Sequence, residues 1–369
     1  MHKTALAAVL ERPGARFSVE PVALDELRAD EALIRIEACG ICHTDLKVET
    51  RMALPAVLGH EGTGIIEEVG AEVTAVKRGE RVVLSYPWCG RCPPCERSEP
   101  FRCERIPALK FGGCRLDGSR PLSRNGQPLT SAFFQQSSFA TRAIAHGATL
   151  VPVQTELPPE MLAPLGCGVQ TGAGSILNTF QVGKAEPLVV IGAGAVGLSA
   201  ILAARLVGAS PIIAVDVNAE RLELARELGA THAFHASHGD VAARVRGVMP
   251  HGAKYVLETS ASVAGLNDAI GCVSQGGVVG IVSPPAPGEV PLLNLRGLFE
   301  RVATLECIVQ GSSVPRDFIP KLIALHLQGK FPYEKLVTVY DFGDINRAVD
   351  DARRGDAIKP VLLMPAARS

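Results

Sequence analysis

The chain lacks an excess of charge of either sign. Its 369 residues include 37 Lys and Arg against 38 Asp and Glu, which gives a net charge of -1 at pH 7 and a pI of about 6.8. Proteins that bind DNA or RNA usually gather the phosphates on a basic face. The charge balance therefore argues against a nucleic acid as partner.

The chain also lacks a hydrophobic run that suits a leader or a membrane span. Residues 1–10 are followed at once by Glu11 and Arg12, so no signal peptide is expected. The uncharged stretch 187–204 is nearly long enough to cross a bilayer. It begins with a β-branched run, continues with three glycines and ends in an Ala- and Leu-rich pattern. A strand, a turn and a helix therefore explain this stretch better than a membrane span does. We expect no membrane partner.

Cysteine, in contrast, is plentiful. With no sign of secretion, ten cysteines indicate a reducing compartment, and we expect the cytoplasm. Residues 89–103 read CGRCPPCERSEPFRC, in which two-residue gaps let a turn aim the sulfurs inward. The spacing predicts a closed, tetrahedral structural zinc site. A disulfide pair or chance clustering is the less favoured reading of Cys89, Cys92, Cys95 and Cys103.

Length and pattern predict two domains of an α/β protein. The hydrophobic fraction is 47%, which is enough for a core in each domain. Short strand-like runs dominate to about residue 149, at 32–37, 64–69 and 81–84. From about residue 172, four buried strand patterns alternate with helical ones. The strands are expected at 188–191, 212–215, 255–258 and 278–282, and the helices at 198–207, 219–228 and 263–273. This alternation predicts a doubly wound, parallel Rossmann sheet.

A glycine motif lies where the first of these strands meets its helix. Gly192 permits a tight turn, Gly194 leaves room for a pyrophosphate, and Gly197 lets helix and strand pack closely. Free N–H groups at the helix start would hold the phosphate charge. A similar sheet that binds no nucleotide is the alternative.

The residue at the end of the second strand predicts which dinucleotide is used. Asp216 lies about 20 residues beyond the motif, where a carboxylate binds ribose hydroxyls and repels a 2′-phosphate. Arg221 could neutralise such a phosphate, but Asp216 is expected to dominate. We therefore predict NAD rather than NADP.

Three further metal-binding side chains lie far apart in glycine-flanked segments. Cys42 lies in GICHTD, His60 in GHEG and Cys167 in GCGVQTG. Two thiolates and one imidazole would leave a fourth zinc position open, as in catalytic zinc sites. Spacing alone does not bring them together, because each could be a buried Cys or a turn His.

A family resemblance brings them together. Six motifs follow one another along the chain in this order: GICHTD, GHEGTGIIEEVG, the four-cysteine lobe, GCGVQTGAGSILN, GAGAVGLSA and VDVNAERLELARELGATH. Together they resemble the zinc-dependent medium-chain alcohol dehydrogenases over nearly the whole chain. SSFATRAI and PLGCGVQTGAGSILN are most similar to bacterial aryl-alcohol (benzyl alcohol) and geraniol dehydrogenases. The resemblance implies a mostly β, GroES-like catalytic domain at 1–168 and 312–369, and an NAD-binding Rossmann domain at 169–311.

The resemblance also implies two zinc ions per chain and a set of residue roles. Cys42, His60 and Cys167 would hold the catalytic zinc, and the four-cysteine lobe the structural one. Glu61 resembles the acid behind the zinc, and Asp45 the carboxylate that orients the histidine ligand. The other implied roles are substrate contact by Thr44, pyrophosphate contact by His43, and packing behind the nicotinamide by Thr171 and Val196.

The implied reaction converts an alcohol and NAD⁺ to an aldehyde and NADH, reversibly, with zinc as Lewis acid. Thr44 would pass the proton to a ribose hydroxyl of the cofactor. In many relatives a histidine continues this relay at the position of Lys47. We expect Lys47 to be solvated, and water to finish the relay.

The substrate is expected to be a primary aromatic or allylic, terpenoid-like alcohol. Ser85, Tyr86, Trp88 and the loop 48–55 are expected to line its pocket. A broad aliphatic alcohol dehydrogenase and a glutathione-adduct formaldehyde dehydrogenase are the alternative enzymes. A non-catalytic nucleotide-binding homologue is the remote one.

Two further expectations concern assembly and the remaining His and Cys residues. The long segment 103–138 and the strand-like run 302–309 favour a homodimer, with a tetramer as the alternative. We expect structural roles for the pattern His232, His235 and His238, and burial among apolar groups for Cys39, Cys114, Cys272 and Cys307.

Overall fold

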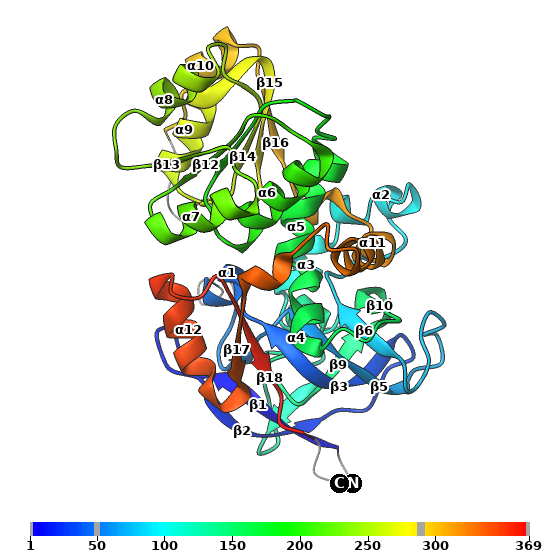
Figure 1. Cartoon of the computed structure of the whole chain (residues 1–369). Helices are drawn as coiled ribbons and strands as arrows, with labels where there is room; N and C mark the ends of the chain where they lie inside the picture. The colour runs from blue at the N-terminus through cyan, green and yellow to red at the C-terminus, as the bar shows by residue number, and fades with distance from the viewer. Residues whose placement is uncertain (1–2, 48–51, 286–291, 367–369) are drawn as a thin grey trace. The chain divides into compact units, whose positions relative to one another are not determined.

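The computed structural model describes residues 3–47, 52–285 and 292–366. The chain forms two compact units (Figure 1). The first comprises residues 1–167, 314–321 and 336–369, and the second comprises 168–313 and 322–335. The sequence prediction had placed all of 312–369 in the first domain. In the structure, residues 322–335 belong to the second unit instead.

The first unit is built mainly from two antiparallel sheets. The smaller sheet has the order β4-β1-β2-β7-β8, and the larger has the order β10-β6-β5-β3-β18-β17, with β9 also paired to β3. The strands are β1 (Thr4–Leu10), β2 (Ser18–Leu24), β3 (Glu31–Gly40), β4 (Ala56–Val57), β5 (Glu61–Val69), β6 (Arg81–Leu84), β7 (Leu122–Arg124), β8 (Gln127–Pro128), β9 (Arg142–His146), β10 (Leu150–Pro152), β17 (Val337–Asp341) and β18 (Lys359–Leu363).

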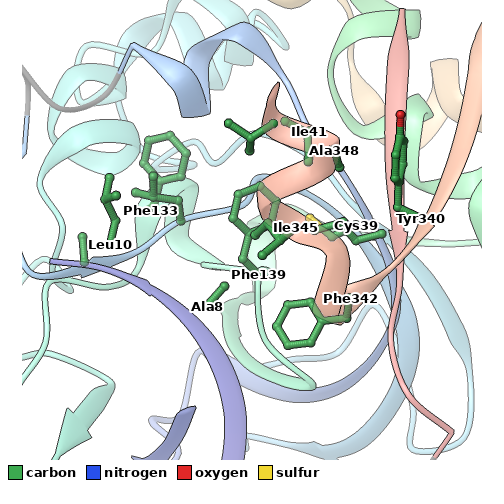
Figure 2. Packing of buried hydrophobic residues seen from close by; sticks show 14 of the residues in the cluster. Ala8, Leu10, Cys39, Ile41, Phe133, Phe139, Tyr340, Phe342, Ile345 and Ala348 are labelled. Carbon is green, nitrogen blue, oxygen red and sulfur yellow. The ribbon is translucent and has the colours of Figure 1, made fainter. Parts of the chain in front are cut away.

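Short helices complete this unit and close its core. They are α1 (His43–Leu46), α2 (Pro93–Glu96), α3 (Ile106–Phe111), α4 (Pro159–Leu162) and α12 (Ile345–Arg354). Figure 2 shows Ile345 and Ala348 of α12 among the buried side chains of Phe133, Phe139 and Cys39. The C-terminal segment is therefore part of the same hydrophobic core as the first strands of the chain.

The second unit holds a six-stranded, fully parallel sheet in the order β13-β12-β11-β14-β15-β16. Numbered from β11, this order is 3-2-1-4-5-6, the doubly wound arrangement of dinucleotide-binding domains. Its strands are β11 (Leu188–Ile191), β12 (Ile212–Asp216), β13 (His232–His235), β14 (Ala253–Glu258), β15 (Val273–Ile281) and β16 (Thr304–Cys307). Its helices are α5 (Gly168–Gly174), α6 (Ala195–Val207), α7 (Ala219–Leu228), α8 (Val241–Val248), α9 (Val263–Cys272) and α10 (Leu295–Glu300). One further helix, α11 (Pro315–Leu327), begins in the first unit and ends in the second.

The predicted fold class is confirmed. Where the predicted bounds of an element agree with the structure, local sequence signals explain the agreement. The helix predicted at 219–228 has these same bounds because Asn218 caps its start and Gly229 follows its end. The hydrophobic stretch after residue 187 forms β11, a turn and α6, as predicted. Within the described ranges, no helix has both the length and the apolar character needed to cross a membrane.

Candidate functional site

One cluster of possible metal ligands joins residues that are far apart in the sequence. Ligand atoms of Cys42, His60, Glu61 and Cys167 all lie within 4.8 Å of one another. Cys42 immediately precedes α1, His60 immediately precedes β5, and Cys167 follows a 3-10 turn. The fold therefore brings together the three residues that the family resemblance predicted as ligands of one zinc.

The carboxylate of Asp45 contacts two residues of this cluster and orients the His60 ring. This carboxylate is buried and accepts hydrogen bonds from Cys42 N at 2.8 Å and Gly59 N at 3.1 Å. It also lies 3.0 Å from Nδ1 of His60. A carboxylate at this position holds the proton on Nδ1 and directs the lone pair of Nε2 to the other side of the ring.

The other ring nitrogen of His60 provides a test of whether a metal fits. Nε2 is fully buried and has no hydrogen-bond partner among the described residues, although it faces a cluster with two thiols. A buried polar atom of this kind is costly unless a partner outside the protein satisfies it. Two sulfurs and one imidazole nitrogen are a donor set that Zn²⁺ prefers. The residues present therefore fit a zinc ion.

The electrostatics of the cluster agree with this fit. Burial alone would lower the pKa of His60, but the charges of Asp45 and Cys42 raise it to about 10. A hydrogen bond from the Cys167 thiol holds the pKa of Cys42 well below its usual range, whereas the pKa of Cys167 is raised by that pairing and by burial. Without a metal the cluster shares protons among its donors, and a divalent cation would replace them.

Glu61 is held in place by a buried lysine from the end of the chain. Nζ of Lys359 lies 2.8 Å from both carboxylate oxygens of Glu61 and 3.2 Å from Ile41 O. Both side chains are buried. A Cβ atom at Gly40 would lie 2.1 Å from Glu61 Oε2, so only glycine fits beside this ion pair.

A strained segment, 132–137, packs against His60. Ala132, Phe134, Gln135 and Ser137 all have φ between 50° and 59°, a region that is unfavourable for side chains other than glycine. This backbone stacks the Phe134 ring on the His60 ring, with centroids 4.3 Å apart and an angle of 26° between the ring planes. In the same segment, Gln136 donates from Nε2 to the backbone oxygens of His60 and Ser85. Segment 132–137 therefore shapes one side of the cluster.

The second thiol cluster is the predicted four-cysteine lobe. The sulfurs of Cys89, Cys92, Cys95 and Cys103 all lie within 4.8 Å of one another. Cys92 Sγ lies 3.4 Å from Cys95 Sγ, and Cys103 Sγ accepts a hydrogen bond from Cys89 N. Prolines at the start of α2 set the turn between Cys92 and Cys95. Four sulfurs can fill a tetrahedral shell, which is typical of structural zinc.

The glycine motif in the second unit forms an open cradle at the start of α6. Gly192 has φ +92°, and a Cβ atom at Gly197 would lie 1.8 Å from Gly192 O. At Gly194, which caps α6, a Cβ atom would meet nothing within 4 Å. The two outer glycines are therefore required by the turn and its packing, and the middle one borders space that a phosphate group could use.

Asp216 lies at the end of β12 and is tied to the same turn. Oδ2 accepts a hydrogen bond from Ala193 N at 2.5 Å, and Oδ1 accepts one from Asn218 N at 2.8 Å. Each oxygen keeps a further lone pair for a ribose hydroxyl. Arg221 lies in the first turn of α7, Val196 in the first turn of α6, and Thr171 in α5 beside Gln310.

The remaining predicted site residues lie near Cys42. The sulfur of Cys42 lies 3.8 Å from Thr44 Oγ1, while His43 and Lys47 are exposed. Ser85 and Tyr86 are buried, and Trp88 is half-buried. The part of the predicted pocket loop at 48–51 lies outside the described residues.

Two expectations about cysteine and histidine have different outcomes. Cys39 and Cys272 are buried, but Cys114 is half-buried and Cys307 is exposed on the edge strand β16, so burial was wrongly predicted for Cys307. His235 and His238 stack on each other at 4.2 Å. The two metal-ligand clusters found among the described residues include neither of them, nor His232.

Sequence analysis missed four residues near the metal cluster: Lys359, Phe134, Gln136 and Lys110. No motif marks them, because each meets the cluster through the fold rather than through spacing. Lys359 is 298 residues from Glu61, and Gln136 is 76 residues from His60. An isolated Lys or Phe in a sequence does not indicate such a contact.

Comparisons with known proteins agree with this geometry. Residues 28–154 match the family "Alcohol dehydrogenase GroES-like domain", and residues 195–326 match the family "Zinc-binding dehydrogenase". A geraniol dehydrogenase from Castellaniella defragrans is 44% identical over 365 residues, which cover 98% of each chain.

Solved structures are similar over the whole chain as well. An alcohol dehydrogenase zinc-binding domain protein from Burkholderia ambifaria has a TM-score of 0.95 and 43% identity, with 99% of this chain and 100% of that chain covered. Benzyl alcohol dehydrogenase from Acinetobacter calcoaceticus has a TM-score of 0.94 and 40% identity, with 98% and 100% covered.

Proposed function

The chain belongs to the zinc-binding alcohol dehydrogenases of the medium-chain family, and on that basis we propose that it oxidises primary aromatic or allylic alcohols to aldehydes with NAD⁺. The observation that carries the proposal is the Asp45–His60 pair, which presents a buried, unpartnered Nε2 to the thiols of Cys42 and Cys167. Similarity to a geraniol dehydrogenase and to a benzyl alcohol dehydrogenase supports the substrate class.

The side chains of the first unit would divide the work of the reaction. Cys42, His60 and Cys167 would hold zinc, which as a Lewis acid lowers the pKa of a hydroxyl from roughly 16 toward about 7. Thr44 lies beside Cys42 and would accept the hydroxyl proton of the substrate. Lys47 is exposed, so the proton can pass to water without it.

The second unit would hold the dinucleotide. The open space at Gly194 and the N–H groups at the start of α6 suit the pyrophosphate, and Asp216 suits the ribose hydroxyls. A 2′-phosphate beside the Asp216 carboxylate would be repelled, so we propose a preference for NAD⁺ over NADP⁺.

A substrate panel with both dinucleotides tests these proposals. Zinc-loaded protein, with zinc counted per chain, would be assayed with benzyl alcohol, geraniol, ethanol and hydroxymethylglutathione. We expect two zinc ions per chain and the highest kcat/KM with benzyl alcohol or geraniol and NAD⁺. Preference for ethanol or the glutathione adduct would favour one of the alternative enzymes. Absence of NADH formation with every alcohol would favour a non-catalytic homologue.

We also propose that the protein is a homodimer that pairs along β16. This strand lies at one end of the parallel sheet, and Leu305 on it is 37% exposed. Val302 and Phe299 beside it are 72% and 83% exposed, so apolar surface continues past the strand edge. Light scattering should give twice the chain mass, and Leu305→Lys should shift it toward the monomer. A tetramer mass would support the alternative assembly.

Cysteine usage supports a cytoplasmic location. All ten cysteines are free thiols, including the closely spaced pair Cys92 and Cys95. Zinc sites built from thiolates persist in a reducing compartment, whereas oxidation would convert such pairs to disulfides. Fractionation of cells that produce the protein would test this proposal.

A further inference from the structure

Lys110 is a buried lysine that has no counter-ion among the described residues. It lies in α3, and only 6% of its surface is exposed. Among the described residues, its Nζ makes neither a hydrogen bond nor an ion pair. The other buried lysine, Lys359, has both, through Glu61 and Ile41 O. Lysine is rarely buried without such partners, so Lys110 needs a separate explanation.

Two aromatic rings lie close to the Lys110 ammonium. Nζ lies 5.3 Å from the centre of the Tyr86 ring and 5.1 Å from the centre of the Phe134 ring. Phe134 is the ring that stacks on the proposed zinc ligand His60. The faces of two rings attract a cation, which offsets part of the cost of taking it out of water. Ring faces are not conventional hydrogen-bond acceptors, so within the described ranges the ammonium protons have no oxygen or nitrogen acceptor.

The ammonium is near the metal cluster and is not sealed off. Burial lowers the pKa of Lys110 to about 8, and an interaction with Cys167 opposes that shift. At pH 7 the side chain is therefore mostly protonated. Among the described residues, a few fully buried side-chain atoms lack a hydrogen bond, and His60 Nε2 is one of them. Nζ of Lys110 is not one of them, so it keeps some access from outside.

We propose that Lys110 is a specificity-determining residue that donates a hydrogen bond to an acceptor oxygen, best a carboxylate, carried by the substrate at a distance from its reacting hydroxyl. This inference rests on the proposed alcohol dehydrogenase function. The ammonium, which the two rings leave without an oxygen partner of their own, suits an anionic substituent on the proposed aromatic substrate. The substrate class is thus narrowed to aryl alcohols and aldehydes with a carboxylate on the ring.

The test compares two alcohols that differ only in that group, 4-(hydroxymethyl)benzoate and 4-methylbenzyl alcohol. kcat/KM for each would be measured with zinc-loaded wild type, Lys110→Met and Lys110→Arg. Met keeps the length of the side chain without its charge, and Arg keeps the charge. Lys77→Met, which removes an exposed lysine of the same unit, is the matched control.

The measured ratio is kcat/KM for 4-(hydroxymethyl)benzoate divided by kcat/KM for 4-methylbenzyl alcohol. We expect Lys110→Met to lower this ratio by about 10- to 100-fold, because a hydrogen bond to a charged group is lost. The change should lie mainly in KM, Lys110→Arg should restore part of the ratio, and Lys77→Met should leave it unchanged. If the role of Lys110 were merely structural, its replacement would lower kcat/KM for both substrates equally. An unchanged ratio in Lys110→Met would therefore refute the inference.

Two further outcomes keep the result interpretable. If Lys110→Met does not fold, the wild-type ratio decides, because an apolar pocket without a donor would strongly reject the carboxylate. A wild-type preference for 4-methylbenzyl alcohol would then overturn the inference. If zinc-loaded wild type oxidises neither these alcohols nor benzyl alcohol, the proposed function itself fails. If the enzyme oxidises 4-methylbenzyl alcohol but the ratio of kcat/KM for the two alcohols does not change in Lys110→Met, only the inference about Lys110 fails.

Discussion

The two thiol clusters use similar donors in very different surroundings. Cys89, Cys92, Cys95 and Cys103 come from one stretch of fifteen residues and need only two turns to meet. Cys42, His60 and Cys167 come from three distant segments and are backed by Asp45, Glu61 and Lys359. The first cluster offers four protein sulfurs, and the second offers two sulfurs and the imidazole of His60, whose Nε2 has no hydrogen-bond partner among the described residues. From this contrast we propose that the first cluster serves stability and the second serves turnover.

The largest effect should follow from removing a ligand of the second cluster. We expect Cys167→Ala to lower kcat/KM for benzyl alcohol by about a thousandfold or more, because the Lewis acid is lost, and to reduce zinc from two ions to one per chain. Circular dichroism should show an unchanged fold. Cys39→Ala, which removes a buried thiol outside the cluster, is the control and should retain two zinc ions. Full activity in Cys167→Ala would break the distinction between the clusters.

A smaller loss of activity is expected when Asp45, which contacts the proposed ligand His60, is changed. Asp45→Asn keeps the shape of the side chain but turns an N–H₂ group toward donors such as Cys42 N or His60 Nδ1. Loss of a carboxylate that orients a ligand costs about 10- to 100-fold in metal affinity or activity. Chelator competition should show faster loss of one zinc, with the other unaffected. Equal loss of both ions would mean that the two clusters are not independent.

The first cluster should respond in stability rather than in turnover. We expect Cys95→Ala to lower the melting temperature by about 10 °C, because a structural zinc contributes to the folding free energy. At a temperature where the variant is folded, kcat per active site should stay within about threefold of wild type. A variant that melts normally but has lost its turnover would reverse the roles assigned to the clusters.

The smallest effect is expected at the exposed end of α1. Lys47→Ala should keep kcat within about threefold over pH 6 to 9, because Lys47 is exposed and the proton can pass to water without it. A loss of about a hundredfold that added amine buffers rescue would instead assign the proton relay to Lys47.

The sequence predicted those parts of the molecule that local rules determine. The helix at 219–228 has its cap and its terminating glycine beside it, and the strands around Gly192 are short, apolar and bounded by turns. The four-cysteine lobe is equally local. These features need only the chemistry of neighbouring residues, so one sequence is sufficient to place them.

Contacts between distant segments could not be predicted in this way. Cys42, His60 and Cys167 were grouped only through the family resemblance, and the Glu61–Lys359 pair carries no signal at all. Lys110 gave no signal either, because nothing in its neighbourhood along the chain indicates that two rings would enclose it. The exposure of Cys307 follows from the position of β16 at the sheet edge, which the order of strands along the chain does not state.

The buried bond between Glu61 and Lys359 has a consequence for how the protein is made. The lysine lies on β18, 298 residues beyond Glu61, and β18 pairs with β3, which leads to Cys42. Until that strand is synthesised, the Glu61 carboxylate beside the metal ligands lacks its buried partner, and an unpaired buried charge is strongly unfavourable. We therefore expect the proposed catalytic cluster to acquire its metal only after β18 has been synthesised. The cysteine lobe, complete by residue 103, could be loaded during synthesis.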